Sequence, residues 1–214
     1  MTCAICKTRR ARRHCPGVRG EICTLCCGKE REVTVDCPLD CEFLIEARRH
    51  ERPAEIAPEQ VPNKEIRVTD QFLSEKKELV AFVMRSVAEA GLGARAVDPD
   101  LRDALDGLVR TYRTLQSGLQ YESVPDNPVA AAVFRHLQMR VQEARRREAD
   151  SGMVRTRDAD ILGALVFLQR LELTRSNGRP KGRAFLGALA SLYESALESP
   201  GSGGGPAATS LILP

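Results

Sequence analysis

The chain has 214 residues, of which 43% are hydrophobic and 29% are charged, and its formal net charge is +3. This length corresponds to one or two domains, and the nearly balanced charge is not that of a strongly basic nucleic-acid-binding protein. The longest apolar runs, near residues 79–84 and 161–168, are far shorter than the roughly 20 residues of a transmembrane helix. Residues 9–13 are basic where a signal peptide would be apolar, so we expect a cytoplasmic protein.

All eight cysteines lie within the first 41 residues of the chain. They are Cys3, Cys6, Cys15, Cys23, Cys26, Cys27, Cys37 and Cys41, with the spacing C-x2-C-x8-C-x7-C-x2-C-C-x9-C-x3-C. In a reducing compartment, clustered cysteines are more often metal ligands than disulfides. Eight thiolates complete two tetrahedral sites, so the sequence predicts a module that holds two structural Zn²⁺ ions.

Short elements of secondary structure are expected between these cysteines. Val33 and Val35 alternate with polar residues, which predicts a strand over residues 31–36. Asp40 is a favourable N-cap residue, so a helix is predicted over residues 42–52 with Cys41 in its first turn. A paired-cysteine turn, a strand and ligands at the start of a helix form a treble-clef arrangement.

The cysteine order also resembles that of the cross-brace zinc fingers of the HIT, MYND and B-box kinds. The resemblance covers residues 3–41, and it departs from HIT-type fingers at Val18, where those have a cysteine that Cys27 is expected to replace. Interleaved pairing would give one ion Cys3, Cys6, Cys23 and Cys26, and the other ion Cys15, Cys27, Cys37 and Cys41. The alternative, a single treble clef, pairs Cys23 and Cys26 with Cys37 and Cys41. His14 is a further candidate ligand, although eight cysteines already complete both sites.

The remainder of the chain is predicted to be helical. Three prolines among polar residues predict an extended linker over residues 53–68. Helical periodicity then predicts five helices, near residues 70–90, 98–118, 127–147, 158–173 and 180–198, and Asp98-Pro99 and Asn127-Pro128 are start signals. The predicted fold class is therefore mainly α, with a treble-clef-like zinc module (1–52), an all-α bundle of about five helices (69–198) and a flexible glycine-rich tail (199–214).

Two groups of cations are candidate contacts for nucleic acid. One consists of Arg9, Arg10, Arg12 and Arg13, and the other lies in Gly178-Arg179-Pro180-Lys181, which resembles the core of an AT-hook. Ligation of two zinc ions by eight thiolates would leave the module close to neutral, which weakens this interpretation. The AT-hook-like sequence is more simply read as a loop followed by a proline that starts the last helix.

An enzyme is the least favoured interpretation. We find no motif for a nucleophile or a phosphate-binding loop, and two sites closed by four thiolates each leave no open metal position. His136 has no partner histidine at ligand spacing. The sequence therefore predicts a non-enzymatic zinc-binding protein that acts as a protein-interaction or regulatory adaptor for an unidentified protein partner. The alternatives are nucleic-acid binding through residues 9–13 with Arg179 and Lys181, and, last, a metal-dependent or thiol redox enzyme.

Overall fold

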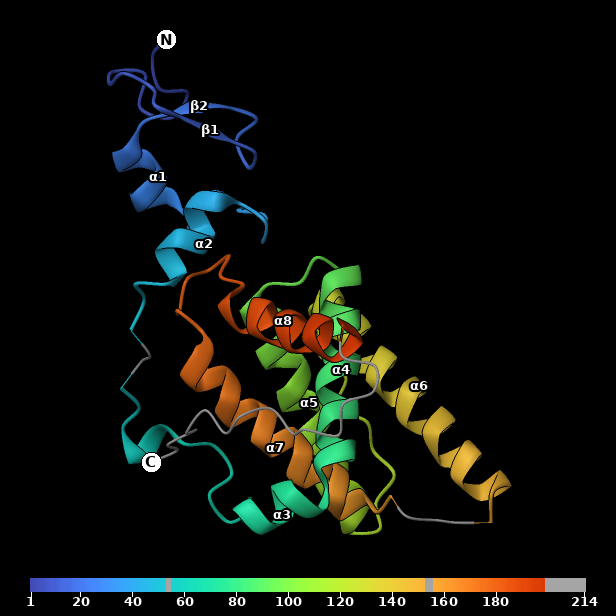
Figure 1. Ribbon diagram of the computed structural model, residues 1–214. Helices are drawn as coiled ribbons and strands as arrows, with labels where there is room; N and C mark the ends of the chain where they lie inside the picture. The colour runs from blue at the N-terminus through green and yellow to red at the C-terminus, as the bar shows by residue number, and fades with distance from the viewer. Residues whose placement is uncertain (53–54, 153–155, 199–214) are drawn as a thin grey trace.

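The computed structural model describes residues 1–52, 55–152 and 156–198, so the tail predicted over residues 199–214 lies outside the described residues. The predicted fold class is confirmed. The protein is mainly helical, with a short hairpin and two short helices at the N-terminus followed by a packed helical bundle (Figure 1). Within the described residues, no helix is both long enough and apolar enough to cross a membrane.

The N-terminal module is built from a two-stranded hairpin and two helices. Strands β1 (Arg13–Cys15) and β2 (Gly20–Ile22) pair in antiparallel fashion, with Arg13 opposite Ile22 and Cys15 opposite Gly20. Helix α1 (Thr24–Glu30) and helix α2 (Glu42–Arg48) follow. The buried hydrophobic residues are five cysteines with Ile22, Val35 and Leu44. So small an apolar core indicates that the module needs a further source of stability.

Two local predictions for the module are wrong, and one helix was not predicted. Residues 31–36 form a turn rather than a strand, because the Glu30 carbonyl accepts hydrogen bonds from the backbone N–H groups of Val33, Thr34 and Val35. Helix α1 was not predicted, since it is only seven residues long and its one buried residue is Cys26. Helix α2 ends at Arg48 instead of residue 52, and its N-cap residue is Cys41 rather than Asp40.

The bundle consists of α4 (Lys77–Gly93), α5 (Asp98–Gln116), α6 (Pro128–Asp150), α7 (Asp158–Arg175) and α8 (Ala184–Glu198), preceded by the short α3 (Asp70–Glu75). Helix α7 is the central helix, since all of its residues from Ile161 to Leu168 are buried and it packs against α4, α5 and α8. Asn127 caps α6 as predicted, because its side-chain oxygen accepts hydrogen bonds from the backbone N–H groups of Val129 and Ala130.

The first two predicted helices of the bundle differ in detail from the structure. The single helix expected over residues 70–90 breaks at Lys76, whose Nζ lies 2.9 Å from Asp160 Oδ2. This break lets the Phe72 ring pack directly on Gly163 of α7, where any side chain would collide with it. Asp98 is not the N-cap of α5 but lies inside it.

The carboxylate of Asp98 instead caps α8. It accepts hydrogen bonds from the backbone N–H groups of Phe185 at 3.0 Å and Leu186 at 3.1 Å. Helix α8 therefore begins at Ala184 rather than near Pro180. The preceding loop, residues 176–183, is left free to contact other parts of the chain.

Part of the segment predicted as a linker lies along α7. Arg170 Nη2 donates to the carbonyl oxygens of Asn63 at 2.8 Å and Ile66 at 2.9 Å. The Asn63 side chain donates to Gln169 Oε1 at 2.6 Å. Figure 1 shows the module at one end of the bundle, beside the loop that joins α7 to α8. The chain therefore returns from α7 to the module, and these two distant parts of the sequence meet.

Candidate metal centre

Four cysteines of the module form a compact sulfur cluster, which we call the first cysteine set: Cys3, Cys6, Cys23 and Cys26. Their sulfur atoms all lie within 4.8 Å of one another. In a tetrahedral zinc site with Zn–S bonds of about 2.3 Å, sulfur atoms are about 3.8 Å apart. Small side-chain movements would therefore bring all four to ligand distance, and the cluster can hold one metal ion.

The backbone around the first cysteine set explains why these side chains converge. A tight turn brings Cys3 and Cys6 together, with the Cys3 carbonyl accepting from Lys7 N–H at 2.8 Å. Cys23 is the N-cap residue of α1, and its sulfur accepts a hydrogen bond from the Cys26 backbone N–H at 3.4 Å. The structure thus places Cys23 and Cys26 with the first pair of cysteines, as interleaved pairing requires.

Two thiols of this set, Cys6 and Cys26, have shifted pKa values in opposite directions. A hydrogen bond from the Thr8 side chain, with the backbone N–H groups of Thr8 and Arg9, lowers the pKa of Cys6 to about 5. Burial raises the pKa of Cys26 to about 12, and its thiol neighbours add to this effect. Hydrogen bonding to Cys23 raises the pKa of Arg9, whose cation lies beside the cluster. Metal binding must therefore displace protons from this set, at Cys26 above all.

The other four cysteines, Cys15, Cys27, Cys37 and Cys41, form the second cysteine set. They line one cavity of about 20 Å³ at the base of the hairpin, together with His14, Ile22 and Leu44. A cavity of this size accommodates about one water molecule, and therefore a single ion. Among the described residues, however, no group of three or more Cys, His, Asp or Glu side chains beyond the first set comes within 4.8 Å.

Two arginines surround Cys27 in the second set. Arg13 Nη1 lies 3.5 Å and Arg31 Nη2 lies 3.8 Å from the Cys27 sulfur. Metal-bound ligands commonly have such outer hydrogen-bond partners. His14 lines the same cavity, but its Nδ1 lies 3.3 Å from Glu21 Oε1 across the hairpin and its ring is largely exposed.

Several cations that were candidates for nucleic-acid contacts are bound within the protein itself. Arg13 lies over the Phe43 ring, 4.3 Å from its centroid, in addition to its contact with Cys27. Arg179 Nη1 donates to the Arg31 carbonyl at 2.8 Å, and Lys181 Nζ donates to the Thr34 carbonyl at 2.6 Å. These internal contacts engage three of the cations that binding to a phosphate backbone would require.

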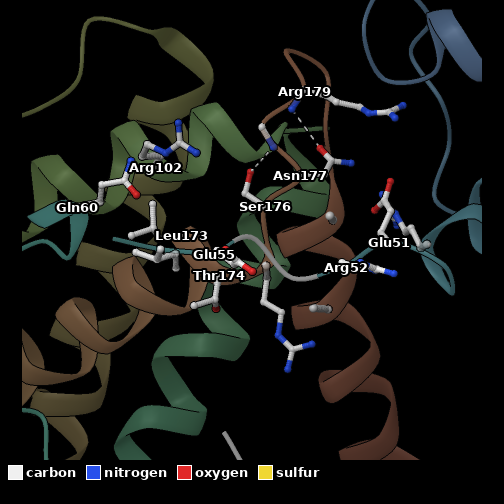
Figure 2. A pocket seen from close by; sticks show the side chains of 16 residues that line it. Glu51, Arg52, Glu55, Gln60, Arg102, Leu173, Thr174, Ser176, Asn177 and Arg179 are labelled. Atoms are coloured by element: carbon white, nitrogen blue, oxygen red, sulfur yellow. Dashed lines mark hydrogen bonds between the residues drawn. The ribbon is translucent and has the colours of Figure 1, made fainter. Parts of the chain in front are cut away.

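A cleft of about 690 Å³ separates α2 and residues 51, 52, 55, 56 and 60 from the end of α7 and the loop after it. Figure 2 shows Ser176, Asn177 and Arg179 on one wall and Glu51 with Arg52 on another. Two further cations in its walls are paired with carboxylates. Arg48 lies 2.8 Å from Glu32, and Arg102 contacts the buried Glu172 at 2.7 and 3.1 Å. The cleft is therefore lined by side chains of both charge signs. Its residues are scattered along the chain, so no local sequence pattern predicted it.

In comparisons with known proteins, no family model, curated protein or solved structure matches this chain. No family is therefore identified, and the resemblance to cross-brace fingers remains a prediction from cysteine spacing. The structure itself supports a zinc-binding module through the four-cysteine cluster beside the hairpin and α1.

Proposed function

We propose that this chain is a non-enzymatic zinc protein whose module carries two structural zinc ions and acts with the helical bundle as a protein-interaction adaptor. The observation that supports it most is the convergence of four sulfur atoms within 4.8 Å. Four thiolates fill the coordination shell of zinc, so no position remains for a water or a substrate. A metal held in this way stabilises a fold rather than performing a reaction.

The second zinc ion is supported by the single cavity that all four cysteines of the second set line. Arg13 and Arg31 beside Cys27 would offset the negative charge of a four-thiolate site. To bind an ion at this site, the four cysteine side chains must move inward until their sulfur atoms reach ligand distance. The cavity between them has space for one ion.

Native mass spectrometry of the purified chain tests both metal sites. We expect two zinc ions per wild-type chain and one zinc ion in each of the single variants Cys6→Ser and Cys41→Ser. His14→Ala is the matched control, since a chain that uses only cysteine ligands retains two ions. Wild-type protein with less than one zinc per chain would contradict the proposal for both sites, and one zinc would contradict it for the second.

The adaptor role is supported by exposed apolar residues on the short helices of the module. Leu25 on α1 is 54% exposed and Ile45 on α2 is 42% exposed, which leaves hydrophobic side chains available to a protein partner. Pull-downs with zinc-verified bait should recover a partner that Leu25→Asp or Ile45→Asp loses and that Glu59→Gln, an exposed charge change elsewhere, retains. Recovery of nucleic acid that depends on Arg10 and Arg12 and is released by salt would instead favour the nucleic-acid alternative.

A further inference from the structure

One short segment of the module both contacts the bundle and ends at a cysteine of the second set. Residues 31–37 run from the end of α1 to Cys37, which lines the second cavity. The Arg31 carbonyl accepts from Arg179 Nη1, and the Glu32 carbonyl accepts from the Lys181 backbone N–H, both at 2.8 Å. We call residues 31–37 and residues 176–183 together the junction. A movement of Cys37 therefore acts directly on the contact between module and bundle.

Glu32 is the centre of the junction. Its side chain is 0% exposed, and its carboxylate accepts hydrogen bonds from Arg48 Nη2 at 2.8 Å, Asn177 Nδ2 at 2.8 Å and the Arg183 backbone N–H at 3.0 Å. Burial of a carboxylate costs several kcal/mol unless such partners remain in place. Glu32 also has a φ of 54°, a left-handed conformation that is unfavourable for a residue with a side chain. This geometry is maintained only while the surrounding contacts hold both the backbone and the carboxylate.

Arg183 connects the same segment to the bundle from the other side. Its guanidinium donates to the Cys37 carbonyl at 3.3 Å and contacts the Asp36 carboxylate. The same group donates to the Ala96 carbonyl at 2.9 Å and the Arg95 carbonyl at 3.1 Å, in the turn between α4 and α5. One buried cation thus links the backbone of a second-set cysteine to the helical core.

We infer that metal bound by the second cysteine set controls the docking of the module on the bundle through Glu32 and Arg183. This inference rests on the proposed second zinc ion. Metal would fix Cys27, four residues before the segment, and Cys37 at its end. Without metal, the turn relaxes, the Glu32 carboxylate leaves its three donors for water, and residues 176–183 lose their partners. The cleft between module and bundle widens as a result, because its walls belong to both.

Hydrogen–deuterium exchange of the full chain, followed by mass spectrometry, tests the inference. Peptides covering residues 176–187 should exchange about tenfold faster or more after chelation, since local opening no longer has to break the junction contacts. Cys41→Ser, which is expected to lose only the second zinc ion, should reproduce this change. Cys6→Ser, which is expected to lose only the first, should leave these peptides close to wild type, and equal acceleration by both variants would overturn the inference.

Zinc counts on the same samples separate the inference from the proposed function. A chain that never binds a second ion contradicts the proposed second site. A chain that binds two ions, and whose 176–187 peptides exchange at the same rate after losing the second, overturns the coupling alone.

Substitutions at the junction provide an independent test, because they change no cysteine ligand. Glu32→Gln should accelerate exchange in residues 176–187 to the rate of the chelated wild type, and Asn177→Ala should give a smaller increase. Glu59→Gln, an exposed change of the same kind, should leave the rate unchanged. Weaker zinc retention at the second set in Glu32→Gln would support the coupling, because coupling between two sites is reciprocal. Wild-type exchange in Glu32→Gln would contradict it.

Discussion

In the bundle, apolar side chains from α4 to α8 form one continuous core, whereas the buried residues of the module are mainly cysteines with Ile22, Val35 and Leu44 beside them. Each large apolar side chain that becomes fully buried contributes about 1.5–3 kcal/mol. Three such side chains cannot offset the conformational entropy of the module, while each structural zinc can supply on the order of 10 kcal/mol. The comparison indicates that packing stabilises the bundle, whereas the module needs a further source of stability, which the proposed zinc ions would supply.

Removal of zinc should produce the largest difference between the responses of the module and the bundle. We expect chelation to unfold the module, because it removes on the order of 10 kcal/mol for each ion, while the helices of the bundle stay folded. Limited proteolysis should then cut within residues 1–52, and far-ultraviolet circular dichroism should keep most of its helical signal. Chelator presaturated with zinc is the control. Loss of most helicity along with the zinc would show that the bundle also depends on metal.

A substitution that creates a cavity in the centre of the bundle should destabilise the bundle and leave the metal in the module. Leu165 of α7 is 0% exposed, so Leu165→Ala should lower the free energy of unfolding by about 3–4 kcal/mol, measured in urea. Leu192 of α8 is 54% exposed, and Leu192→Ala should change that free energy by less than about 0.5 kcal/mol. Both variants should retain their zinc. Loss of metal from Leu165→Ala would contradict the separate origins of stability.

The sequence predicted the bundle well because its signals are local. Apolar periodicity located all five long helices, and Asn127 caps α6 as its position before Pro128 indicates. The alternation of Val33 and Val35 was misleading, because the turn closed by the Glu30 carbonyl and the contacts of Glu32 with the bundle determine that segment. Long-range partners of this kind leave no local pattern.

The first cysteine set and the junction also differ in how far the sequence could predict them. Cysteine spacing identified the paired cysteines but left two groupings open, and only the structure brings Cys3 and Cys6 together with Cys23 and Cys26. The junction could not be predicted, since Glu32 and Asn177 lie far apart in the sequence and neither residue type is unusual in its segment. The cap that Asp98 provides to α8 was missed for the same reason.

The pKa of Asp98 should report how well the bundle excludes water from this carboxyl group. Burial raises the pKa of this carboxyl group from 3.8 to about 6, although hydrogen bonds from Phe185 and Leu186 oppose the shift. The protonated form is therefore favoured by folding, and this stabilisation, on the order of 2–3 kcal/mol, is complete below about pH 4 and is lost as pH rises through about 6. Because acid also releases zinc from thiolates, carboxyl ¹³C NMR of Asp98 is the direct measurement. A midpoint near pH 4 would show that Asp98 is more hydrated than its burial indicates.

A smaller loss of stability is expected at the start of α3. The Thr69 hydroxyl oxygen accepts a hydrogen bond from the Phe72 backbone N–H at 3.1 Å. Thr69→Ala should therefore lower the free energy of unfolding by about 1 kcal/mol, measured in urea with zinc present. Thr69→Ser keeps the oxygen and should behave like wild type. Equal stability of the alanine variant would mean that packing of Phe72 alone fixes the start of this helix.

Zinc K-edge X-ray absorption spectroscopy of the purified full chain tests the central claim, that the module is held by metal in two all-cysteine sites. The predicted spectrum fits four sulfur ligands per zinc at about 2.3 Å, with no nitrogen or oxygen ligand. Metal analysis of the same sample should give two zinc ions per chain. A spectrum that requires a nitrogen or oxygen ligand, or a sample with less than one zinc per chain, would contradict it.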